Sequence, residues 1–245
     1  MKNVQFLSND AKIEKIIHNL NLLRSLFVSA LITGEPHTGK KSLIRHLFPN
    51  YHFVDARDSE MVTESLQKYD TLVLYHFETV VNPKLLDFAD KKIIAIADTR
   101  TPNTFLEEHF AFVVKMPPLR DRASDIPLLA EYYGKTIQHK FAFQKIPDID
   151  YGTLDLSDNN RSLYTSLYRS YFIENLEKRD IEEILRHYFA KHYDGDDIYR
   201  NMLGLFEKPL IEAGLEKYKS QLKLSSVLGL NRNTLRKKIN EHDIL

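Results

Sequence analysis

The sequence predicts an α/β domain with a parallel sheet, followed by a helical region and an all-α helix-turn-helix domain. Short apolar segments alternate with segments of helical periodicity through residues 1–116, which is typical of a parallel sheet covered by helices. A glycine-containing loop joins the first strand to the helix that follows it. Near the C-terminus, a basic helix follows a short helix and a glycine. We therefore expect three domains or regions, at residues 1–116, 117–200 and 201–245.

The composition fits a protein with a substantial core. The chain has 245 residues, of which 43% are hydrophobic, and its 34 Lys and Arg residues balance 34 Asp and Glu residues. There is no cysteine, which excludes disulfides and thiolate metal sites, and the histidines lack the spacing of metal ligands. No apolar run could span a bilayer, and the first residues lack the apolar core of a signal peptide. We expect a cytoplasmic protein without a bound metal or a membrane partner.

Each expected element of the first region has its own periodicity or boundary. The first helix has apolar residues at helical spacing from Ile13 to Leu23, and Ser8 or Asn9 can cap it. Short apolar runs predict five strands, at residues 27–32, 51–54, 71–77, 92–97 and 111–116. Helices before and between the strands are expected at residues 8–23, 40–48, 59–68, 83–89 and 103–109.

After Met116 the pattern becomes helical. Two prolines end the sheet region, and a helix is expected at residues 125–140 with Asp125 as its cap. Residues 161–205 are helical and rich in tyrosine, with a break at residues 194–197. Their apolar residues stand at helical spacing, which predicts packing in a core or in a dimer.

Residues 34–41 have the pattern of a loop that binds phosphate. The loop follows a strand and opens a helix, so its amides and the helix N-terminus would face a phosphate, and Lys40 would reach the outer phosphates. Lys41 stands where Ser or Thr usually gives a hydroxyl to magnesium. Two interpretations stay open: a nucleotide pocket, or a tight strand-to-helix turn that binds no nucleotide.

The segment after Asn231 predicts a helix that contacts DNA. Asn231 is a good N-cap, while Leu235 and Ile239 stand four residues apart and would bury one face. Between Lys208 and Asn240 there are eight Lys or Arg and two Glu, so the charge is one-sided. The alternative is a solvated basic face on an ordinary helix. The residues expected to contact DNA are Asn231, Arg232, Asn233, Thr234, Arg236, Lys237 and Lys238.

This motif resembles the Fis-type DNA-binding domain. The run Asn-Arg-Asn-Thr-Leu-Arg-Lys-Lys at residues 231–238 carries the resemblance, which begins near residue 207. Fis-type domains act as dimers, so the resemblance implies a homodimer through the C-terminal helices, whose two recognition helices enter successive major grooves of double-stranded DNA.

A second resemblance covers residues 8–165 and is to the AAA+ domain of sigma-54-dependent activators. Residues 31–40, with Leu-Ile-Thr-Gly-Glu and Thr-Gly-Lys, are similar to the Walker A segment. Residues 116–129, with Pro-Pro-Leu-Arg-Asp-Arg and Asp-Ile-Pro-Leu-Leu, are similar to the entry of that family's lid. The resemblance implies an AAA+-like P-loop sheet with a helical lid and ATP or ADP as ligand. It also implies a nucleotide-binding set of Gly34, Glu35, Thr38, Gly39, Lys40, Lys41 and, as the sensor arginine, Arg161.

The sequence departs from this family where hydrolysis needs acids and arginines. Tyr75 and His76 stand where the Walker B strand ends in Asp-Glu, and a tyrosine cannot replace a magnesium carboxylate. Glu78 comes two residues late and, by strand alternation, would share the face of His76. Asp98 replaces the sensor Asn, and residues 105–110 carry acids where trans-acting arginines are expected. Catalytic residues are therefore not predicted, and magnesium binding is not favoured.

These patterns predict a bacterial, nucleoid-associated transcription regulator that binds DNA sequence-specifically. Its degenerate ATPase domain would bind nucleotide without hydrolysis or serve as a scaffold. Only 15 residues, 56–70, lie where the family inserts its sigma-contacting loop, and no receiver domain is seen before residue 8. The alternative is an active AAA+ ATPase that remodels a partner such as RNA polymerase, with an unidentified residue holding magnesium.

Overall fold

The computed structural model describes residues 6–24, 26, 28–99, 108 and 110–244, and the chain divides into two compact units. The first unit is Met1–Asn175 and the second is Leu176–Leu245. These boundaries differ from the expected domains, because residues 176–200 lie with the C-terminal helices and residues 117–175 lie with the sheet. No helix in the described part of the chain is long and apolar enough to cross a membrane.

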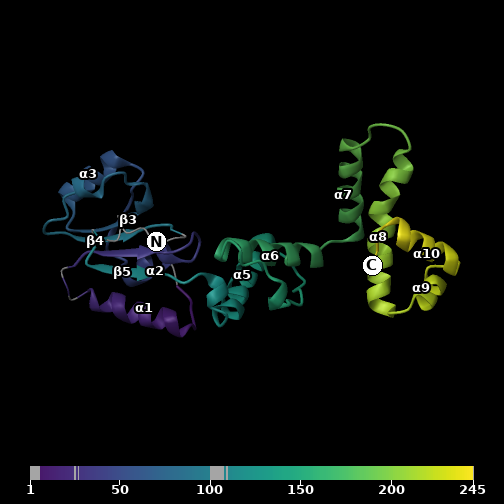
Figure 1. Cartoon of the computed structure of the whole chain (residues 1–245), viewed down its shortest axis with the longest axis horizontal. Coiled ribbons are helices and arrows are strands. Elements are labelled where there is room, and N and C mark those ends of the chain that lie inside the picture. Colours follow the sequence, from purple (N-terminus) through teal and green to yellow (C-terminus); the bar gives the residue numbers. More distant parts are fainter. Residues whose placement is uncertain (1–5, 25, 27, 100–107, 109, 245) are drawn as a thin grey trace. The chain divides into compact units, whose positions relative to one another are not determined.

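The first unit is built on a parallel sheet of five strands (Figure 1). Leu31, in the first strand, pairs with Ala95 on one side and Val113 on the other. The sheet confirms the predicted α/β class and has the order β2-β3-β4-β1-β5. The strands are β1 (Ala30–Thr33), β2 (His52–Asp55), β3 (Thr71–Tyr75), β4 (Lys92–Ile96) and β5 (Phe112–Lys115).

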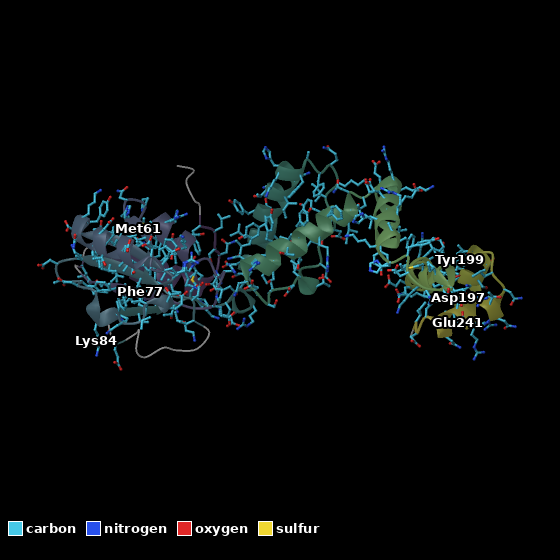
Figure 2. The ribbon with its side chains drawn as sticks, turned by 90° about the horizontal axis from the view of Figure 1, so that it is seen from above. Met61, Phe77, Lys84, Asp197, Tyr199 and Glu241 are labelled. Carbon is cyan, nitrogen blue, oxygen red and sulfur yellow. The ribbon has the colours of Figure 1, made fainter. Side chains whose placement is uncertain are left out.

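Helices cover both faces of this sheet, as Figure 1 shows. α1 (Ala11–Leu22) and α2 (Lys40–Leu47) share one core with Ile32 of β1, whereas α3 (Ser59–Lys68) shares the other core with Leu31. The alternation of side chains along a strand explains why neighbouring residues enter different cores. Figure 2 shows side chains of this unit, among them Phe77, which is fully buried in the α3-side core.

Three local expectations either need correction or concern residues outside the described ranges. Residues 83–89 form only a 3₁₀ turn, η2 (Pro83–Leu85), because the side chains of Asn82 and Asp87 accept hydrogen bonds from backbone amides two residues ahead. The side chain that caps α1 is Asp10, not Ser8 or Asn9. The helix expected at residues 103–109 lies outside the described residues, apart from residue 108.

The lid is formed by α5 (Asp125–Phe141) and α6 (Asn160–Glu174), which pack against each other. Short 3₁₀ turns, η3 (Leu119–Asp121) and η4 (Tyr151–Thr153), precede these helices. Asp125 is not the cap that the sequence predicts: Ser124 flanks the helix, and the Asp125 side chain is fully buried in tertiary contacts. The lid core contains Leu119, Leu129, Ile137, Leu163 and Leu167.

The second unit is helical, with α7 (Lys178–Lys191), α8 (Ile198–Tyr218), α9 (Gln221–Val227) and α10 (Arg232–Glu241). Its core joins the C-terminal half of α8 to α9 and α10 through Ile211, Leu224, Leu235, Ile239 and Ile244. None of the residues of α7 is buried. Figure 2 labels Tyr199 at the start of α8, where this side chain is largely exposed.

Candidate functional site

The loop between β1 and α2 has the backbone shape that the phosphate-loop pattern requires. Gly34 has φ +141°, and a Cβ there would lie 2.6 Å from the carbonyl oxygen of Met116, so only glycine fits. Gly39 has φ +96° and immediately precedes α2, and His37 also has a positive φ of 59°. The loop therefore curls at the N-terminus of α2, where backbone amides can face an anion.

Lys40 is buried under this loop, and its ammonium has three close oxygen partners. Lys40 Nζ lies 2.8 Å from Gly34 O, 2.6 Å from Glu35 O and 2.7 Å from Asp98 Oδ1. An ammonium group has three N–H donors, so these contacts use all of them. Burial lowers the pKa of Lys40, and the nearby Asp98 carboxylate opposes that shift. The loop lysine is thus held by the protein's own oxygens.

Residues that precede the two lid helices also bind the phosphate loop. Arg120 makes a bidentate ion pair with Glu35, at 2.9 and 2.6 Å. Asn159 donates to Pro36 O at 2.9 Å while its Oδ1 accepts from the amide of Leu119. Glu35 therefore faces the lid, and it does not line the cavity described below.

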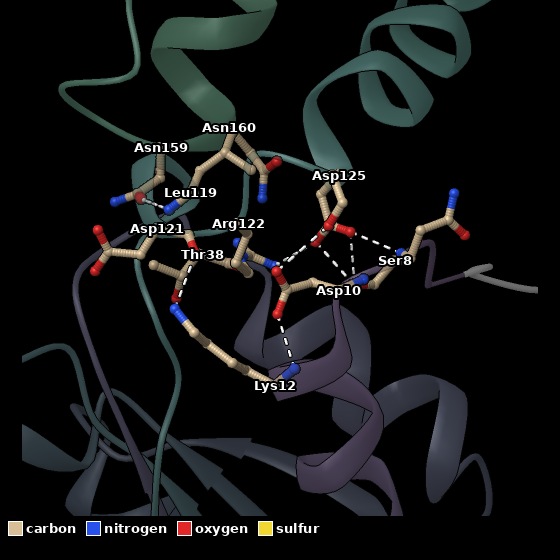
Figure 3. A network of polar contacts seen from close by, with 12 residues as sticks. Ser8, Asp10, Lys12, Thr38, Leu119, Asp121, Arg122, Asp125, Asn159 and Asn160 are labelled. Atoms are coloured by element: carbon tan, nitrogen blue, oxygen red, sulfur yellow. Dashed lines mark hydrogen bonds and ion pairs between the residues drawn. The ribbon is translucent and has the colours of Figure 1, made fainter.

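A buried ion pair joins the lid, the loop and the N-terminal segment (Figure 3). Arg122 lies 3.3 Å from Asp125 and donates to the carbonyl oxygen of Thr38 at 2.9 Å. Asp125 also accepts from the Ser8 hydroxyl at 2.8 Å and from the Asn9 amide at 2.7 Å. This pair was not expected from the sequence, because an Asp at the start of a helix also fits the pattern of a cap.

The end of β3 carries a polar cluster in place of paired carboxylates. His76 has φ 58°, and its Nδ1 lies 3.0 Å from Asp55 Oδ1. Hydrogen bonds from Arg57 and His76 hold the pKa of Asp55 well below its usual range. Glu78 does not follow strand alternation, since β3 ends at Tyr75, and its Oε2 accepts from the Asp98 amide.

These elements surround an open cavity with a volume of about 680 Å³. Of the predicted nucleotide-binding residues, the cavity brings together Thr38, Gly39, Lys40, Lys41 and Arg161. The Arg161 side chain is 72% exposed, and its nearest carboxylate is Asp158 at 3.8 Å. Lining residues that the sequence analysis did not select include Tyr133, Asn160 and Tyr164 from the lid. Asn160 immediately precedes Arg161, which the resemblance selects as the sensor arginine.

The second candidate site is the outer face of α10. Asn231 caps this helix by accepting from the Asn233 amide, and Leu235 and Ile239 are buried, as predicted. Gly229 forms the turn between α9 and α10 with φ +66°. The predicted DNA-contacting residues that lie exposed are Asn231, Arg232, Asn233, Thr234, Arg236 and Lys237.

Lys238 differs from the other predicted DNA contacts. Its Nζ pairs with the Glu207 carboxylate of α8, and its side chain is only 24% exposed. His242 Nε2 lies 3.0 Å from the other oxygen of Glu207. These contacts lower the pKa of Glu207, chiefly through the hydrogen bond from Lys238. Lys238 therefore ties α10 to α8 in the free protein.

Neither site offers a metal centre among the described residues, where no group of three His, Cys, Asp or Glu side chains could hold a metal ion. The residues of the cavity fit a nucleotide better than a metal ion. The curled loop, the N-terminus of α2 and Lys40 are the parts that hold phosphates in P-loop proteins. Bound ATP or ADP would contact Lys40, Lys41 and the amides of residues 37–41.

Comparison with known proteins finds a family match near the C-terminus and relatives over longer parts of the chain. The family described as "Bacterial regulatory protein, Fis family" matches residues 203–242. A putative Fis-like DNA-binding protein of Ralstonia nicotianae is 34% identical over 77 residues, which cover 29% of this chain and 100% of that protein. The DNA-binding transcriptional regulator NtrC of Azospirillum brasilense is 29% identical over 172 residues, covering 54% of this chain and 35% of NtrC. The chain thus spans well under half the length of this NtrC relative.

The fold also matches a solved structure. The crystal structure of NtrX from Brucella abortus in complex with ATP has a TM-score of 0.56 and 15% identity, and the match covers 98% of this chain and 69% of NtrX. At this identity the likeness concerns the fold, which is that of an AAA+ P-loop domain followed by helices. The chain is therefore similar to NtrC over about half of its own length, and its fold is the AAA+-like architecture that the sequence predicted.

Proposed function

We propose that this protein, whose C-terminal domain belongs to the Fis family of bacterial regulatory proteins, is a sequence-specific transcription regulator that binds double-stranded DNA in the bacterial cytoplasm. The outer face of α10 is the observation that carries the proposal. Arg232 and Asn233 can contact base edges, whereas Arg236 and Lys237 supply charge for phosphates. Lys238 holds α10 on α8 and contributes to DNA binding through the position of that helix.

Titration with DNA at several salt concentrations tests this proposal. A duplex is selected from randomised DNA by the full-length protein, and binding is followed by fluorescence anisotropy. Arg236→Ala with Lys237→Ala should weaken binding and lower the slope of log K against log salt by about 1.8, because each phosphate contact contributes about 0.9. The matched control is Lys140→Ala with Arg169→Ala, which removes the same two charge types from the exposed surface of α5 and α6. An unchanged slope in the α10 variant would exclude these residues as phosphate contacts.

The first unit is proposed to bind a nucleotide without hydrolysing it. The cavity brings together Lys40, Lys41 and Arg161, and relatives of this fold include NtrX, which was crystallised with ATP. Hydrolysis needs a carboxylate for the metal and a base for water, but the end of β3 carries Tyr75 and His76 instead. A phosphate-release assay with Lys40→Ala as the control variant tests this: turnover that depends on Lys40 would support an active ATPase that remodels a partner such as RNA polymerase.

The second unit is also proposed to form a homodimer. Ile181, Ile184 and Tyr188 lie on one face of α7 and are 48%, 47% and 41% exposed. Leu205 and Phe206 of α8 are also exposed apolar residues of this unit. A second copy of this unit is the occupant that we propose, because two symmetric recognition helices suit two half-sites of an operator.

A further inference from the structure

Lys41 and Tyr75 contact each other at the rim of the cavity. The ammonium nitrogen of Lys41 lies 3.1 Å from the centroid of the Tyr75 ring, and both residues line the cavity beside Lys40. A cation this close to the face of an aromatic ring is attracted by the negative charge of that face. The contact therefore fixes a positive charge next to the phosphate loop.

The two residues stand at the positions that hold magnesium in P-loop enzymes. In the general P-loop pattern the residue after the loop lysine supplies a Ser or Thr hydroxyl, and another strand of the sheet supplies a carboxylate. Here these positions carry an ammonium and a phenol ring, Lys41 after Lys40 and Tyr75 at the end of β3. Magnesium requires hard oxygen ligands in near-octahedral geometry, so this donor set does not fit the ion.

The nearby carboxylates are already engaged. Asp55 is bound by Arg57 and lies 3.0 Å from His76, while Asp98 is paired with Lys40. Lys40 in turn uses its three donors on protein oxygens. Among the described residues, Lys41 has no carboxylate within ion-pair distance, and its ring contact leaves the N–H donors available. Lys41 is therefore a cation of the cavity whose N–H donors can meet an incoming phosphate.

We propose that Lys41, seated on Tyr75, replaces the divalent cation, so that the cavity binds the phosphates of a nucleotide without metal. The proposal rests on the proposed nucleotide binding by the first unit. It joins two departures from the P-loop pattern into one exchange. The hydroxyl and the carboxylate that would hold the metal are absent, and Lys41 on the Tyr75 ring supplies a positive charge in their place.

Calorimetric titration of the full-length protein with ADP and with ATP, in EDTA and in magnesium chloride, tests the proposal. The dissociation constants in the two media should agree within about threefold for wild type. Lys41→Ala should weaken binding in EDTA by about tenfold or more, as expected for loss of a charge-assisted contact. Lys15→Ala is the matched control, because Lys15 is an exposed lysine of α1 that does not line the cavity. It should change affinity by less than about twofold.

A second variant tests the exchange in the opposite direction. Lys41→Ser combined with Tyr75→Asp restores the hydroxyl and the carboxylate, so binding should become tighter in magnesium than in EDTA. Circular dichroism verifies that each variant is folded. Binding by wild type only in magnesium would overturn the metal replacement but leave nucleotide binding intact. Absence of binding in both media would overturn this inference and nucleotide binding together, while the DNA-binding proposal would stand on its own titration.

Discussion

Lys40 Nζ and Asp98 Oδ1 lie 2.7 Å apart, so the loop lysine is paired inside the protein before any ligand arrives. The Lys40 side chain is 3% exposed and that of Asp98 is 34% exposed. An anionic ligand must therefore compete with the Asp98 carboxylate for Lys40. Because Asp98 is on the side open to solvent, it is the partner that a phosphate can displace.

The Asp98→Asn variant should bind ADP more tightly than wild type. The substitution removes a negative charge from the cavity and weakens the competing contact with Lys40, and we expect a gain of about tenfold in affinity. Isothermal titration calorimetry measures it. Asp70→Asn is the control, because Asp70 is an exposed carboxylate that precedes β3 at the other end of the sheet. Equal affinities of Asp98→Asn and wild type would contradict the idea that this carboxylate opposes phosphate binding.

The stability of the second unit should fall at acid pH through Glu207. Hydrogen bonds from Lys238 and His242 lower the pKa of Glu207 below its ordinary value of 4.5. A carboxylate with a lowered pKa stabilises the folded state above its unfolded pKa, and this stabilisation is lost as the pH falls through the folded pKa. Thermal melting followed by circular dichroism, from neutral pH down to about pH 4, should show this loss.

Glu207→Gln should melt at a lower temperature than wild type at neutral pH, and the two should converge as the pH falls. The matched control is Glu216→Gln, an exposed carboxylate on the same helix. Parallel pH profiles for wild type and Glu207→Gln would show that the contacts of Glu207 with α10 do not stabilise the unit.

The architecture could be predicted because it follows from local patterns. Each β-strand is a short apolar run between turn residues, and the helices on the sheet have apolar residues at helical spacing, so both could be placed within a few residues. The buried face of α10 was predicted from the same spacing, because Leu235 and Ile239 stand four residues apart. The helix expected at residues 83–89 was wrong, because Asn82 and Asp87 bind backbone amides of the same segment.

Partners that are distant in the sequence could not be predicted from such patterns. Asp125 fits a helix cap by position, yet it binds Ser8, which lies more than a hundred residues earlier. Lys238 fits the basic outer face of α10 by its position, yet it forms an ion pair with Glu207 of α8. The nucleotide-binding set predicted by resemblance remains a prediction, although most of its members line one cavity.

Removing one member of the buried pair Arg122 and Asp125 should destabilise the first unit strongly. Both side chains are almost completely buried, and loss of one partner leaves an uncompensated charge, which typically costs about 3–5 kcal/mol. Asp125→Asn also weakens the contacts with Ser8 and Asn9. Urea unfolding followed by circular dichroism measures the change in the free energy of unfolding. The control is Asp121→Asn, which changes an exposed acid four residues before Asp125 and should have a small effect. An equally small effect of Asp125→Asn would contradict the role of the pair.

Ile184→Asp should separate the proposed dimer. Ile184 lies in the middle of the exposed apolar face of α7, between Ile181 and Tyr188, so a carboxylate there would be buried without a partner between two copies. We expect the dissociation constant of the dimer, measured by sedimentation equilibrium, to increase by about tenfold or more. Leu222→Asp on α9 is the control, because this side chain is 64% exposed and lies outside the proposed interface.

The Ile184→Asp variant should retain its helix content, and it should bind a duplex with two half-sites no better than a duplex with one. A wild-type protein that sediments as a monomer at micromolar concentration would contradict the dimer, and equal dissociation constants for Ile184→Asp and wild type would place the interface elsewhere.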